Sequence, residues 1–589
     1  MRMKRTAMLL AAGALVGVSA CGGGGDDSGS EPEGIEGADT AGAAGGKLVE
    51  DATAPAPEVE GAEKGGTATV IADVAPTTLD PTRAYYTDSV SIMSGLVTRS
   101  LTQYRYNPDN GQMELVPDMA VGLGQPNEDF TEWTFELRDG LKYEDGSAVK
   151  AEDVAYAVMR SFAIDELPDG PTYNTQFFLN GDKYKGPYQD GTDYKGVEVD
   201  GNKVTIKMGK PFGDLPYYVS FPQFTAIPQA KDKNPQQYGS HPMATGPYKF
   251  ADYKQGQYLK LAKNEYWDPE TDPARHQYVD GWDFQWGQDQ AAMDQTMLDD
   301  TGTAQTTLSY TDVSPAAYKQ AKESGRLVEG VAPCTYMWFI DQTKIKDKLV
   351  REALSWAFPY QAFWKASGQI AGVTRLPSTS ILPPGTAGRV EYEYPEGQDG
   401  QTTDPAKAKA LLEEAGAMGY EISWPYARDD KQQVAAMTKV KQGLEEAGFT
   451  AKPYATTTDA FRDVYSDYDA PINVRSGSGW CSDWPSGSSW FPAQWDGDLV
   501  GVNGMPNPAN FKQADVDQQM DKILSTMSGQ EANESQAWGK LDKHIQTEYY
   551  PAITVGYDGV AVLHGSKLGG AAINNVTGEP YYPNIYVTE

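Results

Sequence analysis

The feature that most constrains the fold is a helix–glycine–strand unit that occurs twice in the C-terminal half of the chain. In the first unit, Asp404 caps a helix with Pro405 in its first turn, and the helix stops at Gly416. In the second unit a helix ends at Gly448, and a strand-like segment follows. Helices that alternate with strands pack as layers, so this pattern predicts an α/β fold.

Shorter patterns in the N-terminal half add strands and a helix to this prediction. Residues 67–71 read as a strand, and residues 133–137 alternate like a half-buried one. Residues 152–162 place their apolar side chains on one face, which predicts an amphipathic helix. No internal repeat of fixed period is present, so we expect mixed sheets rather than a repeat architecture.

Length and charge exclude several classes of protein. The chain has 589 residues, of which 40% are hydrophobic and 22% charged, so it predicts a folded protein of about three or four structural units. The net charge of -33 repels phosphate backbones, which excludes nucleic acid as a partner. The four histidines lack metal-ligand spacing, so we expect neither a metal nor another cofactor.

The first 21 residues predict export and lipid attachment. Residues 1–20 form a signal peptide, in which basic residues precede an apolar run that is too short to span a membrane. The ending Val-Ser-Ala-Cys at 18–21 resembles the bacterial lipobox, in which cleavage leaves the cysteine carrying diacylglycerol; an ordinary signal peptide is the alternative. A lipidated Cys21 and a flexible acidic tether over 21–65 would hold the protein at the outer face of the cell membrane.

Six segments between residues 77 and 354 fall in an order typical of one family. They are TTLDP at 77–81, VPDMA at 116–120, FELRDGLKYEDG at 135–146, TGPYK at 245–249, KNEYW at 263–267 and VREAL at 350–354. Together they resemble the extracytoplasmic solute-binding proteins that deliver oligopeptides, dipeptides and some other solutes to ABC importers. The resemblance covers roughly residues 66–589.

The likeness is greatest to the oligopeptide-binding branch, through GWCSD at 479–483 and PCTY at 333–336. The resemblance implies that the backbone of Gly479, Trp480 and Cys481 pairs with the peptide as an added strand. It also implies that Asp483 receives the peptide's α-ammonium group and that Cys334 and Cys481 form a disulfide. Strand addition gives affinity without side-chain selectivity, and a carboxylate near the free amine fixes the register.

Alternatives remain open for several of these residues. Asp483 could instead cap a helix or belong to a turn before Pro485, and the two cysteines could be buried free thiols. Trp484 and its aromatic neighbours Trp480, Trp490, Phe491 and Trp495 would form either ordinary core or a cleft wall that stacks on ligand side chains.

Two further ligand contacts follow from the resemblance. Tyr85, Tyr86 and Thr87 fall near the place where the family's first lobe supplies a second backbone edge. The family's basic residue for the peptide carboxylate is expected at Gly477, which cannot supply it. Arg475 is offset from that position, so it either reaches a carboxylate or is an ordinary surface charge.

The fold implied by the resemblance is the two-lobed periplasmic-binding-protein-like fold, in the class with an extra inserted subdomain. Lobe I would take 66–95, 200–332 and 549–589, the inserted subdomain 96–199, and lobe II 333–548. A hinge between the lobes would close around the ligand.

The implied function is that of a monomeric binding protein whose partners are an oligopeptide and the permease of an ABC importer, with its cytoplasmic ATPases. The sequence carries none of the nucleophile-elbow, zinc-protease or P-loop motifs, which argues against an enzyme. A sugar such as a cello-oligosaccharide, or another small solute, is the alternative ligand, and a role as an adhesin or signal receptor subunit also stays open.

Overall fold

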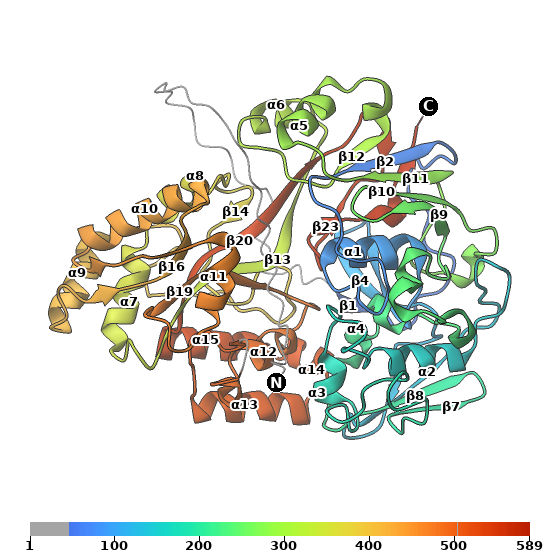
Figure 1. The fold of residues 1–589 in the computed structure, drawn as a ribbon, viewed down its shortest axis with the longest axis horizontal. Coiled ribbons are helices and arrows are strands. Elements are labelled where there is room, and N and C mark those ends of the chain that lie inside the picture. The colour runs from blue at the N-terminus through green and yellow to red at the C-terminus, as the bar shows by residue number, and fades with distance from the viewer. Residues whose placement is uncertain (1–45, 503–504, 589) are drawn as a thin grey trace, which may run out of the picture. The chain divides into compact units, whose positions relative to one another are not determined.

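The computed structural model describes residues 46–502 and 505–588, which form two compact units (Figure 1). Unit 1 contains residues 329–523 and 532–560, and unit 2 contains residues 46–328, 524–531 and 561–588. The chain passes between the units inside two long strands, β13 (Leu327–Ile340) and β20 (Ala552–Leu563), and residues 524–531 make a second, short excursion from unit 1 into unit 2. A separate subdomain over 96–199 stays a prediction.

Unit 1 is built around a four-stranded sheet with the order β14-β20-β13-β19. In it β14 (Arg375–Leu376) is antiparallel to β20, and β19 (Val474–Cys481) is antiparallel to β13. Two short parallel pairs lie beside it, β15 (Glu421–Ile422) with β17 (Thr450–Ala451) and β16 (Pro425–Ala427) with β18 (Tyr454–Thr456). The helices are α7 (Lys348–Ala357), α8 (Tyr360–Ala366), α9 (Pro405–Glu414), α10 (Lys431–Glu446), α11 (Thr458–Tyr465), α12 (Phe491–Gln494), α13 (Ala514–Thr526), α14 (Gly529–Glu534) and α15 (Ala537–Tyr549), of which α13 ends and α14 begins in unit 2.

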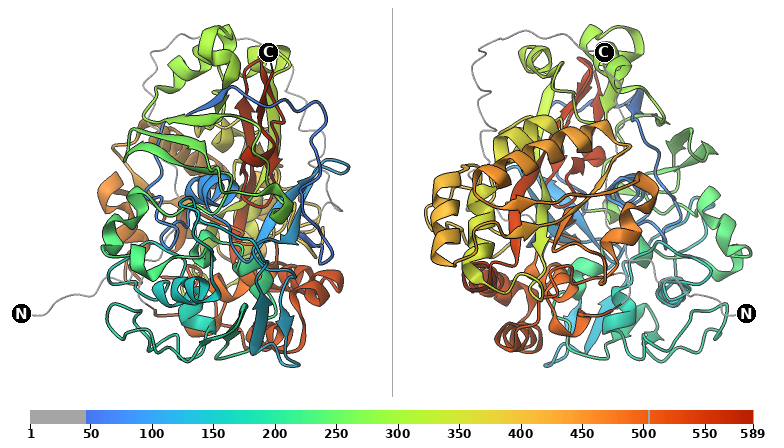
Figure 2. Two further views of the ribbon diagram at one scale, coloured as in Figure 1. Left: turned by 90° about the vertical axis from the view of Figure 1, so that its right-hand side faces the viewer. Right: turned by 60° about the vertical axis from the view of Figure 1, so that its left-hand side comes forward.

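The helix–glycine–strand prediction is confirmed in unit 1. The Asp404 carboxylate accepts a hydrogen bond from the backbone N–H of Lys407 at 2.9 Å and so caps α9. Helices α9 and α10 are each followed by a glycine of positive φ and then by one strand of the β15–β17 pair. Trp338 and Ile340 of β13 pack with apolar side chains of α7–α10, which lie together in Figures 1 and 2.

Unit 2 contains a five-stranded mixed sheet with the order β12-β2-β11-β10-β9. Its strands are β12 (Thr307–Ser309), β2 (Thr67–Ile71), β11 (Gly281–Gln285), β10 (Tyr258–Lys263) and β9 (Tyr248–Lys254). A four-stranded antiparallel sheet contains β5 (Gln125–Pro126), β6 (Glu132–Glu136), β8 (Lys203–Lys207) and β7 (Val197–Asp200). A third sheet contains β1 (Lys47–Leu48), β4 (Gln112–Pro117) and β3 (Thr102–Asn107), and the short pairs are β21 (Leu568–Gly569) with β24 (Tyr586–Val587) and β22 (Ile573–Asn574) with β23 (Glu579–Pro580).

The helices of unit 2 are short and connect these sheets. They are α1 (Thr87–Ile92), α2 (Ala151–Arg160), α3 (Tyr173–Phe177), α4 (Leu215–Tyr218), α5 (Gln290–Asp299) and α6 (Tyr318–Glu323). The predicted strand at 67–71 is β2, the predicted strand at 133–137 is β6, and the predicted helix at 152–162 is α2. Among the residues described, no helix is long and apolar enough to cross a membrane.

The prediction of a flexible tether over 21–65 is wrong for residues 46–65. Val49 donates its backbone N–H to Leu115 at 2.9 Å, and Ala56 donates to Asp272 at 3.0 Å. This segment lacks aromatic side chains, but its backbone hydrogen-bonds to the edge of a sheet, and that attachment does not depend on side-chain type. Residues 21–45, including Cys21, lie outside the described residues.

Candidate ligand-binding site

The GWCSD motif lies on β19, which is the last strand of its sheet. Cys481 stands opposite Cys334, Trp480 opposite Thr335, and Gly479 opposite Tyr336 on β13. No described strand pairs with the other edge of β19. The predicted ligand-pairing segment is therefore an edge strand.

The register shows which backbone groups face this open edge. Ser482 donates its backbone N–H to the carbonyl of Pro333 at 2.7 Å, so this pair is hydrogen-bonded. Hydrogen-bonded and non-hydrogen-bonded pairs alternate along antiparallel strands, so the N–H and C=O groups of Cys481 and Gly479 point away from β13. Two residues on one strand thus present the donors and acceptors that an extended chain needs for strand addition.

The predicted disulfide is confirmed, since Cys334 and Cys481 are bonded across the β13–β19 pair. The interpretation as two free thiols is wrong. The disulfide joins Cys481, the last residue of β19, to Cys334 of β13. It therefore fixes the register of β19 on β13.

Asp483 follows the open edge by two residues and is half-buried. Both neighbours are held firmly: the Trp490 indole N–H donates to the Ser482 hydroxyl at 2.5 Å, and the Trp484 indole is completely buried. The next helix, a short 3-10 turn, is capped by Ser486, and Asp483 lies in the bend before it, so its interpretation as a turn residue before Pro485 stays open. The Asp483 carboxylate therefore lies close along the chain to Gly479 and Cys481, between two neighbours that are packed in place.

The aromatic residues around this motif are mostly core. Trp484 is fully buried and its indole N–H donates to the Ser488 hydroxyl at 2.8 Å, so its predicted contact with a ligand is corrected to a packing role. The fully buried aromatic side chains of this segment also include Trp490, Phe491 and Trp495. Trp480 is half-buried and donates to the Ser489 carbonyl at 2.9 Å, so part of its ring is still accessible.

Arg475 is a buried structural residue. Its side chain is inaccessible to solvent and lies 3.1 Å from the Asp341 carboxylate, and its other donors bond to backbone carbonyls. The interpretation as a surface charge is wrong, and the predicted contact with a ligand carboxylate finds no support because this guanidinium is already occupied. Asp341 lies inside the unit, where the pair neutralises both charges.

A basic group that the sequence patterns did not mark lies over β13, the strand next to β19. The Arg375 guanidinium lies 4.9 Å from the ring centre of Tyr336, the residue opposite Gly479, and it is in ion-pair contact with Asp558. The ion pair is made by Nη1, and Nε has neither a hydrogen-bond nor an ion-pair partner in the structure. Arg375 lies about a hundred residues before the GWCSD motif, on a two-residue strand, so no spacing in the sequence relates the two.

Tyr85, Tyr86 and Thr87 lie in unit 2 at the start of α1, and all three are half-buried. The Tyr85 ring packs 6.4 Å from that of Phe221, measured between ring centres, and Tyr86 is the residue before the helix. The Thr87 hydroxyl donates to the carboxylate of Glu579. Sequence reasoning missed Glu579 because it lies almost five hundred residues away, in a two-residue strand without a motif.

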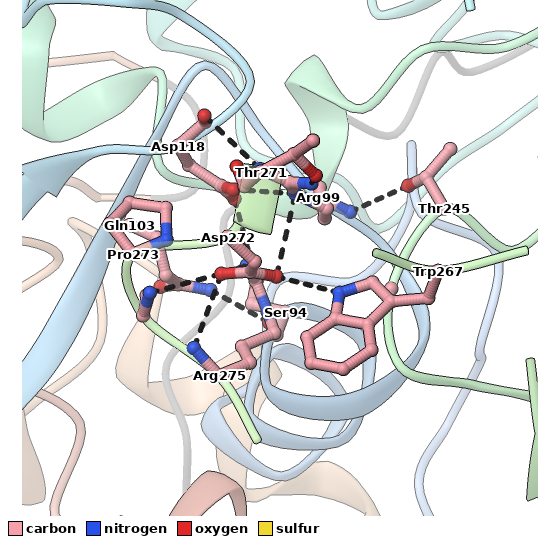
Figure 3. Close-up of polar contacts among 12 residues, drawn as sticks. Ser94, Arg99, Gln103, Asp118, Thr245, Trp267, Thr271, Asp272, Pro273 and Arg275 are labelled. Atoms are coloured by element: carbon pink, nitrogen blue, oxygen red, sulfur yellow. Dashed lines mark hydrogen bonds and ion pairs between the residues drawn. The ribbon is translucent and has the colours of Figure 1, made fainter. Parts of the chain in front are cut away.

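Unit 2 also contains a buried network of two arginines and two aspartates (Figure 3). Asp118 lies 2.7 Å from Arg99 Nε and 2.9 Å from Arg275 Nη2, and Asp272 lies 3.2 Å from Arg275 Nη1. Burial opposes the charge of Asp272, but Arg99 and Arg275 lower its pKa to about 2. The charges balance and the network is enclosed, so it serves stability rather than ligand binding.

Comparison with known proteins places the chain in a family. Residues 114–498 match the family described as bacterial extracellular solute-binding proteins, family 5 Middle. The glutathione-binding protein GsiB of Salmonella paratyphi A is 26% identical over 483 residues, which cover 77% of this chain and 82% of that protein.

Solved structures share the fold. The clavulanic acid biosynthesis oligopeptide binding protein 2 superposes with a TM-score of 0.80 at 22% identity, covering 92% of this chain and 99% of that one. OppA of Listeria monocytogenes bound to peptide superposes with a TM-score of 0.62 at 17% identity, covering 90% and 99%. The family match spans well over half of the sequence, and the chain therefore belongs to family 5 of the bacterial extracellular solute-binding proteins.

Proposed function

We propose that this protein captures extended oligopeptides that carry a free α-ammonium group and delivers them to the permease of an ABC importer. As a family 5 member it is an extracytoplasmic, non-enzymatic solute-binding protein of a peptide-binding family. The open edge of β19 supports a peptide with a free α-ammonium group as the ligand. There the outward-facing backbone groups of Gly479 and Cys481 precede the carboxylate of Asp483.

The chemistry of this edge suits a peptide better than a sugar. An extended peptide offers a row of N–H and C=O groups that matches the edge of a strand, whereas a sugar offers hydroxyl groups and favours aromatic stacking. Of the five aromatic residues around the motif, only Trp480 keeps accessible surface. We propose that Tyr85, Tyr86 and Thr87 of unit 2 also contact the peptide.

Asp483→Asn is expected to weaken binding of free-amine tripeptides about tenfold to a hundredfold, because a charge-assisted hydrogen bond contributes roughly 1.5–3 kcal/mol. Isothermal titration calorimetry on protein stripped of ligand by unfolding and refolding measures this. N-acetylated tripeptides are expected to bind the wild type weakly and to lose little further in the variant.

The matched control is Asp498→Asn, which removes a carboxylate of unit 1 whose side chain is 95% exposed. It is expected to bind every peptide as the wild type does. Equal affinity for free and acetylated peptides would remove Asp483 from the site, and binding of cello-oligosaccharides alone would replace the peptide proposal by the sugar one.

The lipid anchor belongs to the same proposal. A binding protein must stay near its permease, and acylation of Cys21 with two or more chains gives stable membrane attachment. Cells given an alkyne-bearing fatty acid are expected to label the wild type and not Cys21→Ser, which is expected to appear in the soluble fraction. Labelling that survives in Cys21→Ser would contradict the anchor.

A further inference from the structure

A pair of carboxylates in unit 2 lies directly beside the predicted second ligand edge. Glu579 is on β23, and its carboxylate accepts hydrogen bonds from the hydroxyl groups of Thr87 and Tyr310. Asp88 is the neighbour of Thr87 on α1, and α1 packs against β23. Three segments far apart in the sequence, around residues 88, 310 and 579, thus meet at Glu579.

These carboxylates have no cationic partner in the described part of the chain. Neither Glu579 nor Asp88 forms an ion pair with a described lysine, arginine or histidine. The charges that act on Glu579 are those of Asp88 and Asp312, which are both negative. Asp312 accepts a hydrogen bond from the backbone N–H of Ala561 at 2.7 Å, so it too is fixed in place.

The hydroxyl of Tyr582 gives an independent sign that the cluster lacks a partner. Tyr582 is 1% exposed, and its hydroxyl has no hydrogen-bond partner in the structure. The negative charges of Glu579 and Asp88 both reach it, since together with burial they raise its pKa. A buried hydroxyl without a partner costs free energy, which the protein recovers if a ligand group completes the cluster.

The geometry assigns Glu579 and Asp88, with the hydroxyl of Tyr582, as a receptor for an organic cation carried by a side chain of the bound peptide. A buried negative charge without a counter-charge is unfavourable, and an ammonium or guanidinium group would neutralise it. No group of three or more histidine, cysteine or acidic side chains suited to a metal ion occurs in the described residues, which favours an organic cation.

The inference rests on the proposed function and adds a preference for lysine or arginine in the ligand. The α-ammonium group is already assigned to Asp483, which lies in unit 1, so a second anionic site in unit 2 calls for a second cation. Thr87 belongs to the predicted ligand edge and also donates to Glu579, so the proposed cation receptor adjoins that edge.

The test compares charged and neutral side chains of equal length. Alanine tripeptides with one lysine or one arginine, placed in turn at each position, are titrated into the ligand-stripped mature chain against the same peptides with norleucine or citrulline. At one position at least, the cationic peptide is expected to bind about tenfold tighter or more than its neutral counterpart.

Glu579→Gln is expected to remove this difference between the cationic and the neutral peptides, and Asp88→Asn is a second variant in case the first fails to fold. The matched control is Glu265→Gln, which removes an exposed carboxylate of unit 2 paired with Lys249 and should keep the preference. A wild type that binds free-amine peptides without regard to side-chain charge overturns this inference alone. A preference that survives in both variants also overturns it, and a protein that binds no peptide overturns the proposed function as well.

Discussion

Replacing Arg275 by methionine is expected to destabilise the protein by about 3–5 kcal/mol, because it removes one of the two cations that balance the buried carboxylates of Asp118 and Asp272. The Arg275 side chain is inaccessible to solvent and contacts both Asp118 and Asp272. It also donates to the backbone carbonyl of Ser94 at 2.7 Å, which the variant would leave unsatisfied. Urea unfolding followed by tryptophan fluorescence measures the free energy of unfolding.

Lys263→Met is the control for this prediction. Lys263 forms an ion pair with Asp280 in the same unit, but the two side chains are 32% and 62% exposed. Exposed pairs contribute roughly 0–1 kcal/mol, since water and salt screen them. If Arg275→Met cost no more than Lys263→Met, the network in Figure 3 would not have the stabilising role that its burial implies.

Glu579→Gln is expected to make the ligand-free protein more stable than the wild type at pH 8 and about equally stable at pH 4. Burial and the charges of Asp88 and Asp312 raise the pKa of Glu579 to about 7, even though Thr87 and Tyr310 stabilise its ionised form. Between pH 4.5 and 7 the folded protein therefore holds a proton that the unfolded chain has released. The wild type loses stability as the pH rises through this window.

The size of this loss of stability follows from the shift in the pKa of Glu579. A shift from 4.5 to about 7 corresponds to about 3 kcal/mol, and we expect roughly 2 kcal/mol because Glu579 is only half-buried. The measurement is urea unfolding of both proteins at several pH values between 4 and 8.5. A stability difference that stays constant across this range would show that Glu579 does not titrate as its surroundings require.

Unit 2 contains one cluster of buried charges that is balanced and one that is not. The Arg99–Asp118–Asp272–Arg275 network is balanced, and its members stabilise the fold at neutral pH. Glu579 and Asp88 are unbalanced and cost stability in the absence of ligand. Residues that destabilise the unliganded fold are commonly retained for binding, and this is the role proposed for them above.

Local patterns in the sequence were enough to predict five elements, β2, β6, α2, α9 and α10. Strand β2 matches its predicted bounds, and α9 begins after its predicted cap Asp404, because both depend on neighbouring residues only. The GWCSD and PCTY segments predicted the disulfide and the ligand edge, since a resemblance carries information about contacts between distant residues. The tether was predicted too long because backbone pairing to a sheet edge leaves no compositional signal.

What the sequence determined by itself was therefore the α/β class, the family resemblance and the position of the GWCSD motif. Only the tertiary structure decided that Arg475 is buried against Asp341, that Trp484 is core, and that Thr87 meets Glu579. The physical reason is that burial and charge balance depend on which side chains meet in space. Here those side chains come from segments up to almost five hundred residues apart, and no periodicity or spacing along the chain records their meeting.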